Sequence, residues 1–559
     1  TRKSSTKCAE NLDFKRVLWY NYHMETQEIT VEKLLKIIEE KDRTIAELKQ
    51  QVQWFMEQIR LAKHRQFGIS SEQTNVHQMN LFNEAEAAAD LTAPEPSLSE
   101  VKAHYRKKRT RLTTDKLPED LPVEIIEHEL PESERICSDC GSEMHTMGRE
   151  IREELKIIPA KAVIVRHVRH VYSCRNCEET SDRVPVVKAD MPEPVIKGSF
   201  ASPETIAHIA TQKFMMASPL YRQEQEWKQN GILLSRQTMS NWLIKACEEW
   251  LEPIYEKMKQ RLCSHDVLHG DETVLQVLKE PGKAAQSKSY MWLFRTSGEA
   301  KHQIILYDYQ PDRKHTHPEE FLKGFSGYLH ADGYEGYHKL PENITVIGCW
   351  AHMRRKLVEA MKALPKDKQA DSNAAKGVEY CDKLFHLERQ FALLTPEDRR
   401  RERERLSKPL MDEFYDWIGN LNALPKILLG RAVQYARTQR KYLERYLLDG
   451  RLEISNNRAE RSIKPFVIGR KNWIFCNTPN GARASAVYYS LIETARENGL
   501  NPFEYLSWIF TQVPNLGKTG YVTTIEDFLP GSTKIPQKVY IPKPKRQDPE
   551  KYAWEEEDI

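Results

Sequence analysis

A repeating spacing of apolar residues predicts a long helix near the start of the chain. The apolar positions are separated alternately by three and four residues, with Lys41 as the one polar residue on the seam. They are Val31, Leu34, Ile38, Ile45, Leu48, Val52, Phe55 and Ile59. Valine and isoleucine fill one set of seam positions, while leucine and phenylalanine fill most of the other, which favours a parallel two-stranded coiled coil. We therefore predict a dimerisation helix over residues 25–67; the alternative is an amphipathic helix packed against its own chain.

Helical periodicity returns between residues 196 and 262, where it contains a helix-turn-helix pattern. Gly231 supplies the turn and Ser235 is the predicted N-cap of the second helix. The residues predicted to point inward are Met239, Trp242 and Leu243. Those predicted to point outward are Arg236, Gln237, Ser240 and Asn241. A polar outer face of this kind suits the reading of a DNA groove, although ordinary helical domains show the same pattern.

Between residues 263 and 350 the pattern changes to short β-type runs separated by turn residues. These runs predict five strands, with one helical piece, EEFLKGF, between the third and the fourth. The runs are VLHGDETVLQVL, SYMWLFRT, HQIILYDY, GYLHADGY and ITVIGCW. From residue 351 to 448 the chain is helical in pattern and highly charged.

Composition adds that the chain is charge-rich, with 40% hydrophobic and 30% charged residues and a net charge of +3. It lacks an apolar run long enough for a membrane span. The near-neutral total hides a basic run, Lys102–Arg111, which contains six Lys or Arg and no acid. This run predicts contact with nucleic acid, or else a solvated stretch of charge. The predicted contacts in it are Arg106, Lys107, Lys108 and Arg109.

Ten cysteines are present, and four of them form two C-x-x-C pairs with thirty-three residues between them. These four are Cys137, Cys140, Cys174 and Cys177. Two such pairs complete a closed tetrahedral site for one structural Zn²⁺, and the strand-like run between them predicts a zinc ribbon with an intervening hairpin. Beside the second pair, a basic face for DNA or a merely solvated face is expected from Arg166, His167, Arg169 and His170. The scattered remaining cysteines and the absence of an apolar core in Thr1–Glu10 predict a cytoplasmic protein.

Two aspartates lie on predicted strands. Asp271 lies in the first strand and Asp332 at the end of the fourth. Carboxylates on adjacent strands can converge on divalent cations such as Mg²⁺, which prefers hard oxygen ligands. Two such ions ~4 Å apart support phosphoryl transfer. A turn or cap is the alternative role for each aspartate taken alone.

Glu460 is the candidate third carboxylate, in the stretch RLEISNNRAERSIKPF. Ser455 is the predicted N-cap, and Pro465 disfavours helical geometry at the residue before it, so a short helix is expected. Four polar side chains share one face of that helix by their spacing: Asn457, Glu460, Arg461 and Lys464. Such a face suits a DNA backbone beside a metal centre; a surface helix with ion pairs is the alternative.

Together these motifs resemble the transposases of the insertion-sequence-66 family, which are DDE transposases with a ribonuclease H-like catalytic core. The resemblance runs from about Val31 to Val513 and rests on the following stretches: QFGISSEQ, the two C-x-x-C pairs, PLYRQEQEWKQNGILLSRQTMSNWL, HGDETVLQVL, LHADGYEGY, GCWAHMRRKL, SNNRAERSIKP, GRKNWIF and YSLIETARENGLNPFEYL. One departure is Ser455, which stands where the resemblance leads us to expect an acid.

The resemblance implies that Asp271, Asp332 and Glu460 bind two Mg²⁺ or Mn²⁺ ions and carry the catalysis. It also implies DNA contacts near that site, from His352, Arg354 and Arg355. The implied function is a DNA transposase that binds terminal inverted repeats and catalyses strand cleavage and strand transfer. The implied partners are the element ends, target DNA, a second copy of the chain and small accessory proteins of the same element. A nuclease that cuts without joining, and a catalytically inactive zinc-ribbon regulator, are the alternatives.

The expected fold is a multidomain α+β and α/β chain with a mixed-sheet, ribonuclease H-like core. The expected order is a disordered leader (1–24), the coiled coil (25–67), a linker with the basic run (68–118), the zinc ribbon (119–195), a helical DNA-binding domain (196–262), the first part of the core (263–350), a helical insertion (351–448), the second part of the core (449–515) and a tail (516–559).

Overall fold

A computed structural model describes residues 162–173, 186–517 and 523–542, and a helix near the start of the chain through residues 35–36, 38–45, 48–49, 51–52 and 55–56. The larger part divides into a helical unit, residues 348–450, and a unit that contains a sheet, residues 162–347 and 451–542. Among the described residues, no helix combines the length and the apolarity needed to cross a membrane.

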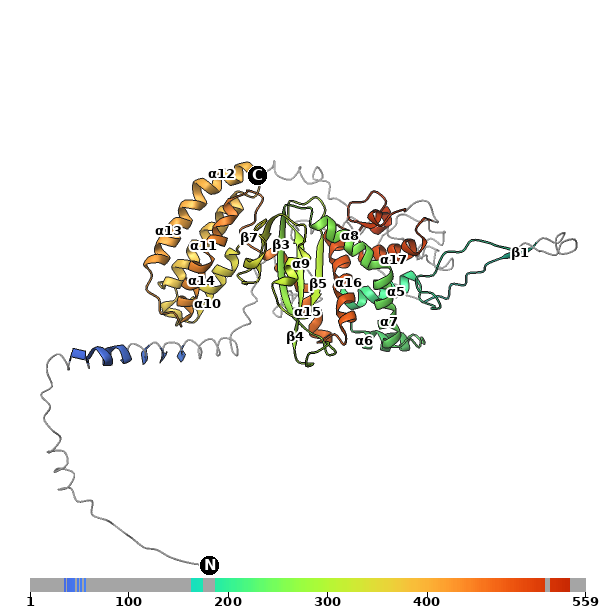
Figure 1. The fold of residues 1–559 in the computed structure, drawn as a ribbon, viewed down its shortest axis with the longest axis horizontal. Coiled ribbons are helices and arrows are strands. Elements are labelled where there is room, and N and C mark those ends of the chain that lie inside the picture. Colours follow the sequence, from blue (N-terminus) through green and yellow to red (C-terminus); the bar gives the residue numbers. More distant parts are fainter. Residues whose placement is uncertain are drawn as a thin grey trace, which may run out of the picture. The chain divides into compact units, whose positions relative to one another are not determined.

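A five-stranded mixed sheet lies at the centre of the second unit (Figure 1). Its strands follow the order β5-β4-β3-β6-β7. Their bounds are β3 Val267–Gln276, β4 Lys288–Thr296, β5 Ile305–Gln310, β6 Gly327–His330 and β7 Ile344–Ile347. The first three are antiparallel neighbours, whereas β6 is parallel to β3 and β7 is parallel to β6. The five predicted strands are confirmed, and so is a helix between the third and fourth, α9 (Thr316–Phe321).

Helix α16 (Pro479–Glu497) runs beside β5, the outer strand of the sheet (Figure 1). Ser490 Oγ accepts the N–H of Tyr307 at 2.8 Å, and Thr494 Oγ1 accepts the N–H of Ile305 at 2.9 Å. An uncovered edge strand offers its free N–H groups to other chains. The hydroxyl groups of α16 satisfy these donors within the chain.

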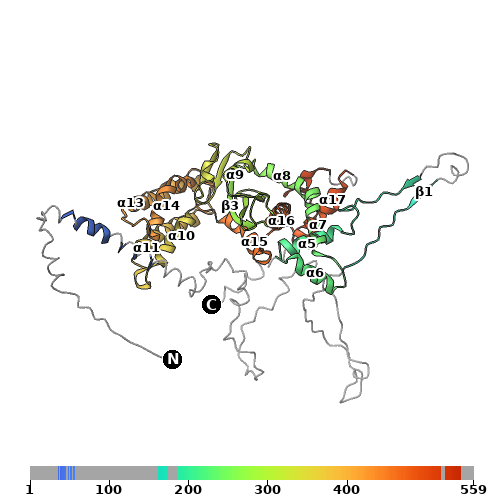
Figure 2. The same ribbon diagram turned by 60° about the horizontal axis from the view of Figure 1, so that its bottom comes forward.

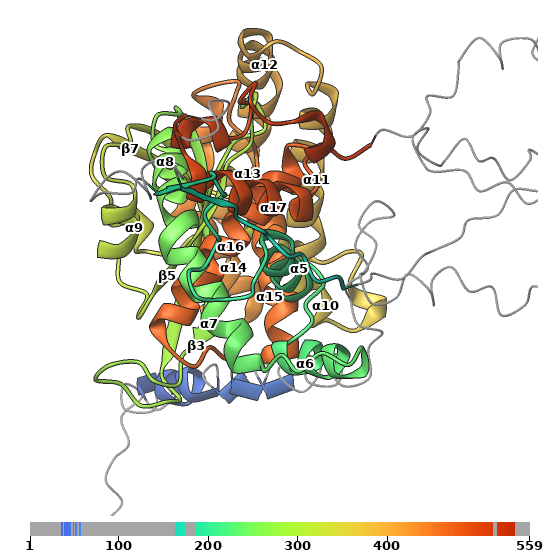
Figure 3. The ribbon, with the colours of Figure 1, turned by 90° about the vertical axis from the view of Figure 1, so that its right-hand side faces the viewer.

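Helices that precede the sheet in sequence pack with those that follow it. They are α5 Pro203–Phe214, α6 Leu220–Gln229, α7 Arg236–Ala246, a π-helical stretch Cys247–Leu251 and α8 Glu252–Leu262. Helix α17 (Pro502–Gln512) lies against α5 (Figure 3). The rings of Phe214 and Tyr488 stack 5.0 Å apart and join α5 to α16.

The predicted burial pattern of α7 is confirmed. Gly231 adopts φ +76° in the turn, and Ser235 Oγ accepts the N–H of Thr238 at 3.1 Å as the N-cap. The residues predicted to face inward are buried, and Ser240 is half-buried. The exposed ones are Arg236, Gln237 and Asn241.

A short hairpin lies before this helical region. β1 (Val171–Ser173) pairs antiparallel with β2 (Val186–Lys188), so β1 pairs with a segment beyond the second C-x-x-C pair. The four cysteines of the predicted zinc ribbon lie outside the described residues, as do the predicted linker and basic run.

The helical unit confirms that residues 351–448 are largely helical. Figure 2 shows its main helices side by side. They are α10 Trp350–Lys362, α11 Asn373–Gln390, α12 Pro396–Glu402, a π-helical stretch Arg403–Ser407, α13 Lys408–Asn420 and α14 Leu428–Leu443. Buried Arg403 donates from Nε to Glu388 of α11 at 2.9 Å and from Nη1 to the carbonyls of Tyr446 and Asp449 at 3.0 Å, which ties the segment after α14 to α11.

Short 3₁₀ turns complete the described chain: Tyr337–Lys339, Lys366–Lys368, Glu444–Leu447, Val513–Asn515, Ile525–Phe528 and Gln537–Val539. Near the N-terminus, the described residues between 35 and 56 are helical, as predicted. Apolar seam residues are exposed on this helix: Ile38, Ile45, Leu48, Val52 and Phe55.

Candidate active site

Asp271 and Asp332 each follow by two residues a histidine on one of two neighbouring parallel strands. His269 of β3 lies opposite His330 of β6, so the two strands are offset by 61 residues, the same number that separates the two aspartates. Asp271 lies within β3, and Asp332 follows the last residue of β6 by two positions. The register thus joins the two strands two residues before each aspartate, and, besides burial, the charge of Asp332 raises the pKa of Asp271, which indicates that the two carboxyl groups are near one another.

Electrostatics join Glu460 to this pair. Burial raises the pKa of Asp271 well above its usual value, and the nearby charges of Glu272, Asp332 and Glu460 raise that pKa further. The backbone N–H of Glu272 donates to Asp271 Oδ1 at 2.8 Å, which opposes the shift. A group of carboxylates that repel one another in a half-buried site fits a divalent cation, since hard oxygen ligands suit Mg²⁺ or Mn²⁺.

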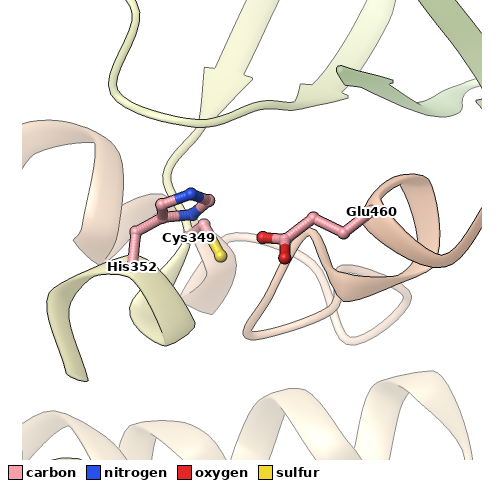
Figure 4. Close-up of side chains that lie close together, drawn as sticks. All are labelled: Cys349, His352 and Glu460. Atoms are coloured by element: carbon pink, nitrogen blue, oxygen red, sulfur yellow. The ribbon is translucent and has the colours of Figure 1, made fainter. Parts of the chain in front are cut away.

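Glu460 lies in the first turn of α15 (Asn457–Trp473), from which its side chain extends (Figure 4). The expectation of a short helix ending at Pro465 is wrong, because α15 has 17 residues with Pro465 in its interior. A proline there removes one backbone hydrogen bond. Tertiary contacts outweigh this loss: the Tyr307 hydroxyl donates to the carbonyl of Ser462, and Arg295 Nη1 donates to the hydroxyl of Ser462.

The N-cap prediction is also wrong. Ser455 is buried, with 8% exposure, and the N-cap is Asn456, whose side chain makes no bond to the helix. Instead, Asn456 Nδ2 donates to the carbonyl of Gly270 at 2.7 Å, and Asn456 Oδ1 lies 3.0 Å from His269 Nδ1. The start of α15 is therefore fastened to β3 directly beside Asp271.

Two buried histidines each precede one of the aspartates by two residues. The rings of His269 and His330 stack with their centroids 4.4 Å apart and an angle of 12° between their planes. His330 Nε2 accepts the N–H of Glu453 at 3.3 Å. Burial lowers the pKa of His269 to about 3. In the sequence, the two histidines and two aspartates form the matching motifs LHGD and LHAD, from which no histidine pair was predicted.

Glu272 is a further acid that the sequence analysis did not single out. Its side chain is 2% exposed; Arg313 Nε donates to it at 2.9 Å and the Tyr337 hydroxyl at 2.7 Å. Burial and the charge of Asp332 raise the pKa of Glu272, while Tyr337 and Arg313 oppose that shift. With its charge compensated in this way, Glu272 belongs to the framework of the site.

The predicted DNA contacts of the helical unit lie on α10. Figure 4 shows Cys349 and His352 at the start of this helix, and Cys349 Sγ lies within 4.8 Å of a ring nitrogen of His352. Arg354 Nε donates to Asp382 of α11 at 2.6 Å, so this guanidinium is held inside the helical unit. DNA contact by His352, Arg354 and Arg355 stays a prediction.

The other predicted DNA contacts lie elsewhere in the sheet-containing unit or outside the described residues. Arg166 and Arg169 precede β1 and are exposed, and Arg169 Nε donates to the carbonyl of Ala189. The backbone N–H of Arg236 donates to Glu224 Oε1 at 3.0 Å. On α15, Arg461 is exposed, while Asn457 and Lys464 are half-buried.

Family comparison decides what kind of protein carries this site. A family model described as "Transposase IS66 family" matches residues 198–484, which contain the sheet, the three acids and the helical unit. The chain belongs to the IS66 transposase family. Three further models match other segments: "zinc-finger binding domain of transposase IS66" at 134–178, "Transposase C of IS166 homeodomain" at 54–126 and "IS66 C-terminal element" at 490–530.

Similar chains occur in Sinorhizobium fredii. The protein named "Uncharacterized protein y4hP" is 29% identical over 457 residues, covering 78% of this chain and 79% of its own. "Uncharacterized protein y4jD" is 28% identical over 522 residues, covering 90% of this chain and 98% of its own. "Uncharacterized protein y4qI" is 30% identical over 406 residues, covering 70% and 72%.

Membership in the family makes this transposase a DNA-modifying enzyme with DNA as its partner. The DDE class of the matched catalytic region implies the use of divalent metal ions. The zinc-finger match spans residues 134–178, which contain all four paired cysteines, and it implies zinc binding in that segment.

Proposed function

We propose that this IS66 transposase cleaves DNA strands at the ends of its element and joins them to target DNA. In this proposal Asp271, Asp332 and Glu460 hold two Mg²⁺ or Mn²⁺ ions. Held by these acids, the ions would supply Lewis-acid chemistry for phosphodiester cleavage and joining. The observation that supports the proposal is the pairing of β3 with β6 two residues before each aspartate, together with the effects of Asp332 and Glu460 on the pKa of Asp271.

The protein's own residues bind and orient the DNA in this scheme. Asn457, Arg461 and Lys464 share a face of α15 with Glu460 and are proposed to hold the phosphate backbone beside the acids. The strand order, three antiparallel strands followed by two parallel ones, supports a ribonuclease H-like core.

Recognition of the element ends is assigned to other segments. The exposed polar face of α7 supports groove reading by Arg236, Gln237 and Asn241. One Zn²⁺ held by Cys137, Cys140, Cys174 and Cys177 would order the preceding segment. The exposed apolar seam between residues 35 and 56 supports pairing with a second copy.

The test uses the full-length chain, a duplex with the element end, Mg²⁺ and a supercoiled target plasmid. We expect both a released 3′-hydroxyl end and joined product. Asp271→Asn, Asp332→Asn and Glu460→Gln should each lower both rates by about 100- to 1000-fold, because several kcal/mol of transition-state stabilisation are lost and each 1.36 kcal/mol is tenfold.

The matched control is Asp266→Asn, an exposed acid just before β3 that pairs with Arg451, and it should keep both rates. Cutting without joined product would instead indicate a nuclease. DNA binding and cutting that survive all three changes would exclude this site.

A further inference from the structure

The three acids come from elements that are far apart in sequence, and only two of them are fixed to each other by the sheet. The pairing of β3 with β6 ends at His269 and His330, two residues before Asp271 and Asp332. Glu460 follows Asp332 by 128 residues, and its helix must be placed against those strands by other contacts. A metal site tolerates little error here, since a misplacement of about 1 Å can cost 100-fold in rate.

We propose that His269, His330 and Asn456 are positioning residues that fix the start of α15 against β3 and β6, and so hold Glu460 beside the two aspartates. This inference rests on the proposed function. It assigns a role to a histidine pair and an amide that the metal chemistry itself does not use.

The histidines share a face with the aspartates. His269 precedes Asp271 by two residues and His330 precedes Asp332 by two, and side chains two apart on a strand point to the same side. The stacked rings therefore lie next to the carboxylates. The segment that leads into α15 lies at the edges of these rings, where its hydrogen bonds end on ring nitrogens.

Each ring bonds to a different residue of that segment. His269 Nδ1 lies 3.0 Å from Asn456 Oδ1, and His330 Nε2 accepts the N–H of Glu453 at 3.3 Å. Asn456 Nδ2 closes the network by donating to the carbonyl of Gly270 at 2.7 Å, next to Asp271.

The network fixes the proton positions. Because Asn456 donates through Nδ2, its Oδ1 must accept, and His269 must donate through Nδ1. Because the N–H of Glu453 donates to His330 Nε2, that nitrogen must carry a lone pair. His269 must therefore present a donor at the Nδ1 position, and His330 must present an acceptor at the Nε2 position.

Because the network is buried, it favours one placement of the start of α15 over others. His269 and His330 are 0% exposed and Asn456 is 1% exposed. A buried polar group that loses its partner costs about 1–3 kcal/mol. A displaced segment would break several such bonds at once, so a single placement of the start of α15 is strongly favoured. Asn456 lies one helical turn before Glu460, so the placement of Asn456 determines where the Glu460 carboxylate lies.

The experiment measures binding of Mn²⁺ alone to the full-length protein, by the loss of the free-ion signal in electron paramagnetic resonance. In the matched variants, each histidine is replaced by the residue whose side-chain amide lies where the hydrogen-bonded ring nitrogen was. Asparagine places its amide near the Nδ1 position and glutamine near the Nε2 position. His269→Asn and His330→Gln should therefore bind Mn²⁺ nearly as wild type does.

The swapped variants, His269→Gln and His330→Asn, place the amide at the position of the other ring nitrogen. These two variants and Asn456→Ala should weaken Mn²⁺ binding by about 10- to 100-fold, the usual loss when a residue that orients a metal ligand is removed. Backbone cleavage by bound Fe²⁺, with hydrogen peroxide as the oxidant and ascorbate as the reductant, should give fewer cuts near Glu460 in these variants.

Leu329→Ala is the control for a merely structural effect, because Leu329 is fully buried in β6 and makes a cavity when shortened. It should lower the melting temperature while it keeps Mn²⁺ affinity below that temperature. Equal Mn²⁺ affinity in matched and swapped variants, or an equal loss in Leu329→Ala, would overturn the inference. Wild type that binds Mn²⁺ no better than Asp271→Asn would instead contradict the metal site of the proposed function.

Discussion

Replacing Asp271 by asparagine should make the metal-free protein more stable, although it removes a proposed metal ligand. The charge of Asp332 acts on Asp271, and two unit charges about 6 Å apart repel by about 3 kcal/mol at an effective dielectric constant near 20. Burial adds a cost for the charged form of Asp271, which is why its pKa is raised. Since both aspartates are half-buried and solvent screens them, we expect a gain of about 1–3 kcal/mol in the free energy of unfolding at pH 7.

The dependence on pH has a definite sign. The pKa of Asp271 is higher in the folded protein than in the unfolded chain, where it is near 3.9. The folded protein therefore holds more protons between these two values, and the free energy of unfolding falls by about 1.4 kcal/mol for each pH unit across that window. Asp271→Asn lacks this loss. The gain over wild type should be near zero below pH 4 and should grow as the pH rises.

Metal should act in the opposite direction. Mn²⁺ at 100 times its dissociation constant stabilises the wild-type fold by about 2.7 kcal/mol, whereas a variant that does not bind gains nothing. Urea denaturation followed by circular dichroism, with and without Mn²⁺, measures both effects. Asp266→Asn serves as the control. An Asp271→Asn protein that is less stable than wild type without metal, or equally stabilised by Mn²⁺, would refute the reasoning.

Three further predictions concern other parts of the chain. Burial raises the pKa of Asp308 on β5 to about 6, so about 3 kcal/mol of stability should be lost as the pH rises from 4 to 6; Asp308→Asn should flatten that part of the urea profile, and an unchanged profile would contradict the buried charge. Arg403→Met should lower the free energy of unfolding by about 3–5 kcal/mol in urea denaturation, because Glu388 loses both its hydrogen bonds to the guanidinium. A loss below 1 kcal/mol would show that this buried ion pair does not stabilise the helical unit. The double variant Ile45→Asp, Val52→Asp should be a monomer by light scattering at concentrations where wild type is paired, and a monomeric wild type would remove the coiled-coil prediction.

Much of the sheet could be predicted from local pattern. All five β-type runs form strands of one sheet, because short apolar runs between turn residues leave few other ways to bury their side chains. The burial of Met239, Trp242 and Leu243 follows helical periodicity in the same way.

The errors lie where tertiary contacts outweigh local preference. Pro465 favours a helix end by itself, yet Tyr307 and Arg295 hold Ser462 from the sheet and α15 continues past it. Ser455 is a good N-cap by residue type, but Asn456 takes the position because its amide is bound to β3.

The role of the histidines could not be read from spacing alone. A buried histidine has many structural uses, and LHGD and LHAD become one feature only when the parallel register sets the two strands side by side. Whether Glu460 lies near the two aspartates likewise depends on the placement of α15. That placement rests on contacts between residues more than 180 positions apart.

The most direct test of the account is single-turnover cleavage of element-end DNA in Mg²⁺ by Glu460→Gln. The amide keeps the size of the side chain and removes its charge, and binding to the same DNA should stay close to wild type. We predict a cleavage rate lower by about 100- to 1000-fold, since several kcal/mol of charge stabilisation in the transition state disappear. Cleavage at the wild-type rate would show that Glu460 is only a surface charge on α15, and the proposed active site would be wrong.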